Sequence, residues 1–238
     1  MKTIKRIIFI LLVLQFSACA ELQQVVDSLP QQQGLSNAQI ASGLKEALNQ
    51  GIDKQVSKLM APDGFYKDQM VRILLPPELK KVDKTLRDLG MGKLADKGIK
   101  LLNTAASDAV KEAKPIFVEA ITTMTFDDAK NILLGNQTAA TDYLKQKTQQ
   151  QLYAKFKPQV KKSLQKVKAD EIWQQIISRY NQIPFVEKVN PDLTDYVTKK
   201  AIAGVYLKIS VEEQKIRKNA QERTTDLLKK VFALQDHR

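Results

Sequence analysis

The sequence predicts an all-α fold, a single multi-helix domain that follows a signal peptide and a short tether. Apolar residues recur at helical spacing through most of the chain. Helix-capping residues, prolines and glycines separate these periodic stretches, and only one short run, 70–75, has a β-like composition. With 43% hydrophobic and 27% charged residues, the composition is that of a globular chain able to bury a core. We expect about eight to ten helices.

The first residues have the pattern of a secretory signal. Lys2, Lys5 and Arg6 precede an apolar run, 7–14, and small residues follow before Cys19. The run is too short to span a bilayer, which takes about 20 residues. Phe-Ser-Ala-Cys resembles a bacterial lipobox, in which the cysteine is acylated, although leucine is more usual where this chain has phenylalanine. The alternative is an ordinary signal peptide cleaved close to Cys19, which then carries no lipid.

These patterns divide the chain into four parts. We expect a lipoprotein signal peptide at 1–18, a lipidated Cys19 with a glutamine-rich tether at 19–34, an all-helical domain at 35–234 and a disordered tail at 235–238. Residue 20 is alanine and not aspartate, which favours the periplasmic face of the outer membrane, with a soluble periplasmic protein as the alternative. Removal of the signal peptide lowers the formal charge from +12 to +9, so the mature chain stays basic.

The first half of the domain is predicted as helices around one connector. Ser36 and Gln39 form a capping-box start, and the first helix ends before a Pro-Asp-Gly turn at 62–64. The run 70–75 is short and solitary, and two prolines end it, so we interpret it as a connector or a small edge element. Helical periodicity then returns at 78–89 and 93–112.

The second half is predicted as further helices. Pro115 either opens a helix as its first residue or kinks a continuing one. Thr125 and Asp128 start a short helix that Gly135 ends. A long periodic stretch follows at 138–168, which we expect Pro158 to break or bend, and then come 170–183, 191–217 and a last helix capped by Thr224 or Thr225.

Several blocks, in order, resemble the bacterial domain-of-unknown-function family 4197 over roughly residues 35–234. The blocks are Leu102-Asn-Thr-Ala-Ala106, Ala120-Ile-Thr-Thr-Met-Thr-Phe-Asp-Asp-Ala129, Ile132-Leu-Leu-Gly135, Ala139-Ala-Thr-Asp-Tyr143, Asp192-Leu-Thr-Asp-Tyr-Val-Thr-Lys199, Glu212-Glu-Gln-Lys-Ile-Arg217 and Arg223-Thr-Thr-Asp-Leu-Leu-Lys-Lys-Val-Phe232. The resemblance implies a helical, secreted or lipid-anchored protein and supplies no reaction. The chain departs from the family pattern at Ser107 and Ala203, where acidic residues are usual, which weakens any site that those carboxylates serve.

The counts of reactive residues exclude many classes of enzyme. The only histidine, His237, is next to last, and the only cysteine is Cys19. This excludes Ser-His-Asp and Cys-His catalysis, histidine-rich metal sites and cysteine-based zinc sites, so we expect no metal and no cofactor. No phosphate-binding glycine loop is present. A carboxylate-based enzyme remains a third possibility, behind two non-enzymatic hypotheses.

A basic stretch is the most distinctive feature of the charge pattern. Between Asp142 and Asp170 there is no acidic residue, and there are eight lysines. A solvated helix face is one interpretation, and contact with anionic lipid phosphates beside the apolar stripe is the other. A lipoprotein address and the lack of arginine argue against nucleic acid as a partner. The stretch contains Lys145 and Lys147 and then the six candidates for the anionic contact, which are Lys155, Lys157, Lys161, Lys162, Lys166 and Lys168.

The paired carboxylates, at 127–128 and 212–213, are the remaining candidates for chemistry. Asp127 and Asp128 suit a helix N-terminus, and Glu213 with Arg217 suits an intrahelical ion pair. A sharper hypothesis is one polar pocket formed by residues that lie in the family-like blocks. Its members are Asn103, Asp128, Thr141, Glu213, Arg217 and Arg223.

Two functional hypotheses follow from these observations. In the first, the chain is a non-enzymatic interaction or structural module of the cell envelope, attached to a membrane through Cys19 and in contact with an anionic lipid surface or an envelope protein. In the second, it binds or carries a small apolar or lipid-like molecule between its helices. An apolar cavity above about 300 Å³ favours the second, and a filled core with an exposed patch favours the first.

Overall fold

The computed structural model describes residues 35–80, 92–166 and 192–236, together with positions 84, 87, 88, 90, 168–171, 174, 178, 181, 182, 184, 185 and 188. The predicted signal peptide, Cys19 and the tether lie outside the described residues, as does most of the predicted helix 170–183. The described part contains seven α-helices and no strand, so the all-α prediction is confirmed. The described residues from Asn37 onward belong to one compact unit.

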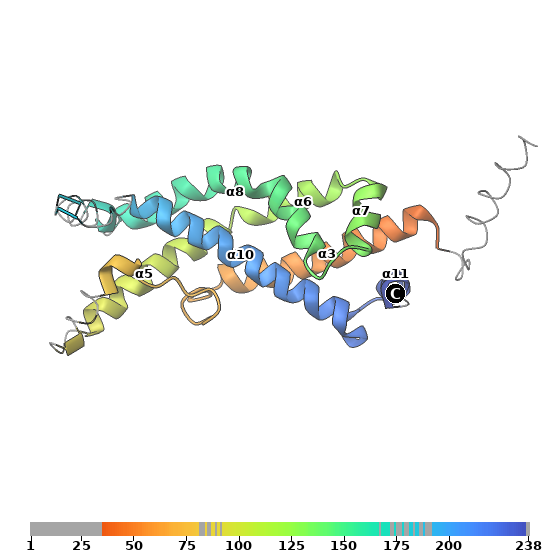
Figure 1. The fold of residues 1–238 in the computed structure, drawn as a ribbon, viewed down its shortest axis with the longest axis horizontal. Helices are drawn as coiled ribbons and strands as arrows, with labels where there is room; N and C mark the ends of the chain where they lie inside the picture. The colour runs from red at the N-terminus through yellow and green to blue at the C-terminus, as the bar shows by residue number, and fades with distance from the viewer. Residues whose placement is uncertain are drawn as a thin grey trace, which may run out of the picture. The chain divides into compact units, whose positions relative to one another are not determined.

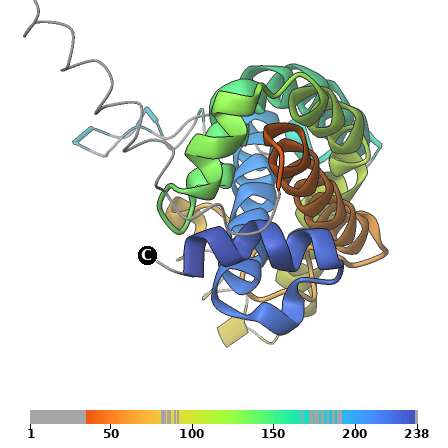
Figure 2. The ribbon, with the colours of Figure 1, turned by 90° about the vertical axis from the view of Figure 1, so that its right-hand side faces the viewer.

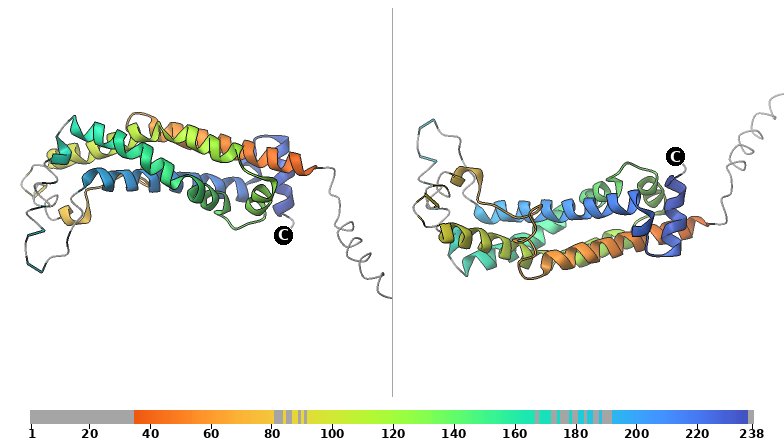
Figure 3. Two further views of the ribbon diagram at one scale, coloured as in Figure 1. Left: turned by 90° about the horizontal axis from the view of Figure 1, so that it is seen from above. Right: turned by 90° about the horizontal axis from the view of Figure 1, so that it is seen from below.

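The longest helices form the centre of this unit (Figures 1 and 3). Helix α10 (Leu193–Lys218) packs against α8 (Ala139–Gln165), α5 (Gly92–Val110) and α3 (Asn37–Met60). Two short helices, α6 (Ala113–Thr122) and α7 (Phe126–Leu133), pack against α3 and α8. Figure 2 shows α11 (Asp226–Asp236) lying across α3, which it contacts.

Helix α8 forms because its apolar residues recur every four residues. Leu144, Leu152, Phe156, Val160 and Leu164 are all 0% exposed, so the predicted stripe faces the core. The helix runs through Pro158 without a break, contrary to one of the two outcomes we expected. Proline removes the hydrogen bond to residue 154, and both positions are exposed, so water can bind the freed carbonyl group.

The boundaries of the helices that the structure describes agree closely with the periodicity, whereas half of the predicted helix 78–89 lies outside the described residues. The run 70–75 is a connector without strand structure, followed by a 3₁₀ turn at Pro77–Leu79. Pro115 is the third residue of α6, in the first turn, where a backbone N–H has no helical acceptor. Thr125 and Asp128 form the predicted capping box of α7. Helix α11 extends to Asp236, so half of the expected disordered tail is helical.

Candidate functional site

The carboxylate of Glu213 caps the N-terminus of α8 from the neighbouring helix α10. It accepts hydrogen bonds from the backbone N–H groups of Ala140 and Thr141, both at 2.9 Å, and from the Thr141 hydroxyl at 2.8 Å. The first N–H groups of a helix have no partner within that helix and carry partial positive charge. Thr138, the N-cap residue of α8, makes no capping hydrogen bond with its side chain. Glu213 therefore supplies the cap that the local sequence lacks.

Arg217 binds the opposite kind of helix end, one turn further along α10. Its guanidinium donates to the carbonyl oxygens of Ile132, at 2.7 Å, and Leu133, at 3.2 Å, which end α7. It also donates to Gln235 of α11 at 2.9 Å and pairs with Glu213, with 3.0 Å between Nε and Oε1. The side chains of Arg217 and Glu213 are 1% and 6% exposed. The pair predicted from their spacing is present, and it is buried.

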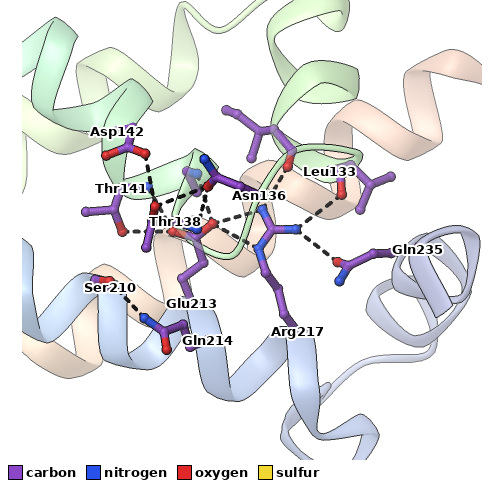
Figure 4. Close-up of polar contacts among 12 residues, drawn as sticks. Leu133, Asn136, Thr138, Thr141, Asp142, Ser210, Glu213, Gln214, Arg217 and Gln235 are labelled. Atoms are coloured by element: carbon purple, nitrogen blue, oxygen red, sulfur yellow. Dashed lines mark hydrogen bonds and ion pairs between the residues drawn. The ribbon is translucent and has the colours of Figure 1, made fainter. Parts of the chain in front are cut away.

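Together, the two side chains attach the α7–α8 turn to α10 (Figure 4). Gly135 sits in this turn, where a Cβ atom would lie 2.7 Å from both Asn131 O and the Ala139 Cβ. The turn is therefore too tight for any side chain at this position. One oxygen of Glu213 accepts hydrogen bonds from the Ala140 N–H and from Arg217, and the other accepts from the N–H and the hydroxyl of Thr141. All the acceptor positions of the carboxylate are therefore occupied. This arrangement is structural in character.

Arg223 lies beside this cluster and closes the C-terminal end of α10. Its guanidinium donates to the carbonyl oxygens of Ile216, at 3.2 Å, and Arg217, at 3.1 Å. It also binds both carboxylate oxygens of Asp236, the longer of the two contacts being 2.8 Å, and lies over the ring of Phe232. The last turn of α11 is thus held to the end of α10.

The other two residues of the predicted pocket lie elsewhere. Asn103 on α5 pairs with the backbone of Ile73. The Ile73 N–H donates to the side-chain oxygen of Asn103 at 2.8 Å, and the side-chain nitrogen of Asn103 donates to the Ile73 carbonyl oxygen at 2.7 Å, so Asn103 fixes the connector. Asp128 belongs to the capping box of α7, where hydrogen bonds from the backbone and hydroxyl of Thr125 lower the pKa of its carboxyl group. The structure therefore brings together Thr141, Glu213, Arg217 and Arg223 and leaves Asn103 and Asp128 apart.

A neighbouring ion pair was missed by the sequence reasoning. Glu212, 4% exposed, accepts hydrogen bonds from Lys54 and, at 2.7 Å, from Gln55 of α3. The hydrogen bond to Glu212 raises the pKa of Lys54. Since α3 and α10 are far apart in the chain, only their packing reveals the contact.

The cavity beside this cluster is small. It measures about 30 Å³ and is lined mainly by apolar residues of α3 and α10. A ligand site of ordinary size needs about 300–1,000 Å³, whereas a water molecule fits in this space.

The described residues contain no group of three or more carboxylate, histidine or cysteine side chains placed to hold a metal ion. Within the same part of the chain, no helix is long and apolar enough to cross a membrane.

The predicted basic stretch covers the outer face of α8. Lys145, Lys147, Lys155, Lys161, Lys162 and Lys166 are exposed, as is Lys168 just beyond the helix. Lys157 is half-buried and contacts Asp192 at 3.1 Å and the Tyr153 hydroxyl at 3.2 Å, both of which raise its pKa. The apolar stripe that these lysines flank is buried in the core.

Most of the blocks quoted for the family resemblance contribute residues to helix ends in this structure. No curated protein and no solved structure matches the chain. A family model does match, over residues 34–233, which is most of the chain. The chain therefore belongs to the family described as "Protein of unknown function (DUF4197)".

Proposed function

We propose that this chain is a non-enzymatic interaction module of the bacterial cell envelope. An acylated Cys19 attaches it to the periplasmic face of the outer membrane, and the outer face of α8 contacts an anionic lipid surface. The observation that carries the proposal is the composition of this face, on which lysine and glutamine predominate and carboxylates are absent between Asp142 and Asp170.

The charge of this face is largely uncompensated. Lys155, Lys161 and Lys162 are exposed and form no ion pair with any residue that the structure describes. A lysine close to an anionic lipid surface contributes about 1 kcal/mol, so three contribute about 3 kcal/mol at moderate salt. Lys157 differs because it already pairs with Asp192. Lys155, Lys161 and Lys162 are therefore among the residues that an anionic surface would engage first.

The use of the buried charges supports a non-enzymatic role. Glu213, Arg217 and Arg223 each bond two backbone groups at helix ends as well as side chains, and the cavity beside them measures about 30 Å³. A reaction needs charged groups that can change partners next to a substrate, and these groups have fixed partners. The small cavity also gives no support to an apolar ligand in the bundle interior.

The anchor is tested by replacing the thiol. Cys19→Ala removes the only cysteine of the chain, so we expect palmitate labelling of the protein to disappear and the protein to leave the membrane fraction. Labelling that persists in the variant contradicts the lipoprotein assignment, and a protein that is unlabelled from the start supports the soluble periplasmic alternative.

The surface contact is tested with vesicles of phosphatidylcholine, with and without phosphatidylglycerol. We expect the triple variant Lys155→Gln, Lys161→Gln, Lys162→Gln to bind the anionic vesicles about a hundredfold more weakly than wild type, most visibly at low salt. A matched control removes the same charge from exposed lysines on α10 and α11, through Lys215→Gln, Lys218→Gln and Lys230→Gln. Equal loss in both variants, or no binding by wild type, rejects the α8 face as a lipid contact and leaves an envelope protein as its partner.

A further inference from the structure

A groove between α8 and α10 is separate from the helix-end cluster. The two helices run antiparallel, because Thr148 contacts Tyr206 while Tyr153, further along α8, contacts Asp195, earlier on α10. Each helix contributes one stripe of residues at helical spacing to the groove, whose volume is about 590 Å³. The lining residues are Lys145, Gln149, Gln150, Tyr153, Lys199, Ile202, Ala203 and Tyr206.

The base of the groove is apolar. Ile202 and Tyr206 are each 6% exposed, so they lie at its bottom, and the exposed Ala203 between them carries only a methyl group. The Tyr206 hydroxyl is bonded to the Thr148 hydroxyl at 2.8 Å, and its burial raises the pKa of Tyr206. The polar end of the ring thus has a partner in the protein. A small side chain at position 203 leaves the groove open.

The rim of the groove is cationic. Lys145 on α8 and Lys199 on α10 line it, together with two glutamines, and no lining residue is acidic. Lys199 pairs with Asp195 at 2.9 Å, and Asp195 also accepts from Tyr153 at 2.6 Å. Lys145 forms no ion pair among the described residues. An apolar base with positive charge and amide donors at the rim matches a molecule that has an apolar body and one anionic group.

We propose that the groove between α8 and α10 binds a small organic anion with an apolar or aromatic body. The body packs on Ile202, Ala203 and Tyr206, and the anionic group meets Lys145 and the glutamine amides. The volume of about 590 Å³ lies within the range of ligand sites in proteins. This site differs from the interior cavity beside Glu213, and it does not depend on a lipid anchor or on a membrane contact.

The probe for the test is 8-anilino-1-naphthalenesulfonate, an aromatic anion whose fluorescence rises in an apolar site. Its uncharged counterpart is N-phenyl-1-naphthylamine, which lacks the sulfonate. The protein is the full chain carrying Cys19→Ala, so no acyl chain competes with the probe. We expect one saturable site for the anionic probe and affinity at least tenfold lower for the neutral one. No saturable binding, or equal affinity for both probes, overturns the proposal.

Two variants locate the site, each with a control of the same chemistry. Ala203→Glu fills the groove and adds a negative charge, and Ala154→Glu makes the same change at an exposed position of α8 that does not line it. Lys145→Gln removes a rim charge, and Lys161→Gln removes one elsewhere on α8. We expect both groove variants to weaken binding of the anionic probe at least tenfold and both controls to change it less than twofold.

All four positions are exposed, so unchanged far-UV circular dichroism and melting temperature are expected. Binding that survives Ala203→Glu overturns the proposal. Equal weakening by the controls also overturns it, because the probe then responds only to net charge.

Discussion

Replacement of Arg217 by methionine is the most direct test of the helix-end cluster. Methionine keeps most of the aliphatic stem and therefore most of the packing, and it removes the guanidinium. The variant loses four contacts at once, those to Ile132, Leu133, Glu213 and Gln235. The carbonyl groups of Ile132 and Leu133 and the Glu213 carboxylate are buried and have no easy route to water, whereas Gln235 is partly exposed.

The expected cost follows from what remains buried. Glu213 keeps three donors after the change, the two N–H groups of α8 and the Thr141 hydroxyl, so it is not left without partners. The carbonyl oxygen of Leu133 loses its donor, at about 1–3 kcal/mol, whereas that of Ile132 still accepts from the Gly135 N–H at 3.2 Å. Removal of one member of a buried ion pair costs about 3–5 kcal/mol in total. We therefore expect the free energy of unfolding to fall by about 3–5 kcal/mol.

Urea unfolding followed by far-UV circular dichroism measures this loss. At an m-value of about 2.5 kcal/mol/M, the midpoint falls by about 1–2 M. The control is Lys229→Met, which breaks an exposed ion pair with Asp226 and is expected to cost less than about 0.5 kcal/mol. A double variant with Glu213→Gln is expected to lose less than the sum of the two single losses, since the partners act together. A loss below about 1 kcal/mol for Arg217→Met refutes the reasoning.

Three further predictions concern single positions. Gly135→Ala is expected to lower the free energy of unfolding by about 1–3 kcal/mol in the same urea assay, because a Cβ atom there lies 2.7 Å from Asn131 O. Its control is Gly98→Ala, whose Cβ has nothing within 4 Å and which is expected to stabilise α5 by about 0.5–1 kcal/mol. Asn103→Ala is expected to cost about 2–3 kcal/mol and to speed hydrogen exchange of the Ile73 amide. The pKa of Asp128 is lowered in the folded state, so its ionised carboxylate stabilises the fold above about pH 4. This stabilisation is lost as the pH falls through the folded-state pKa. We therefore expect the free energy of unfolding of Asp128→Asn to fall less steeply on acidification than that of wild type.

The helices were predictable where local signals decide the structure. The apolar stripe of α8 and the capping box of Thr125 and Asp128 lie within a few residues of one another, so the sequence contains the whole signal. The continuity of α8 through Pro158 was not predictable in the same way. It depends on the exposure of residues 154 and 158, which is a property of the packed unit.

The helix-end cluster was predictable only in part. The spacing of Glu213 and Arg217 predicts their ion pair, but an isolated helix would expose it to water. Burial arises because the α7–α8 turn packs against α10, and this turn contains Gly135 and leads into the N-terminus of α8, where Thr138 makes no side-chain cap. The contact between Lys54 and Glu212 joins residues 158 positions apart, which no local pattern encodes.

The burial of the α8 stripe limits how this helix can meet a membrane. A helix that lies in the membrane interface inserts its apolar face among the lipids, and here that face is packed in the core, with Phe156 at 0% exposure. Contact through lysines alone is electrostatic and weakens with salt. A weak contact of this kind would suffice if the proposed lipid anchor held the body nearby, because the second contact would then be intramolecular. An acylated Cys19 would then supply the anchor, and the α8 lysines would supply a second, weaker contact.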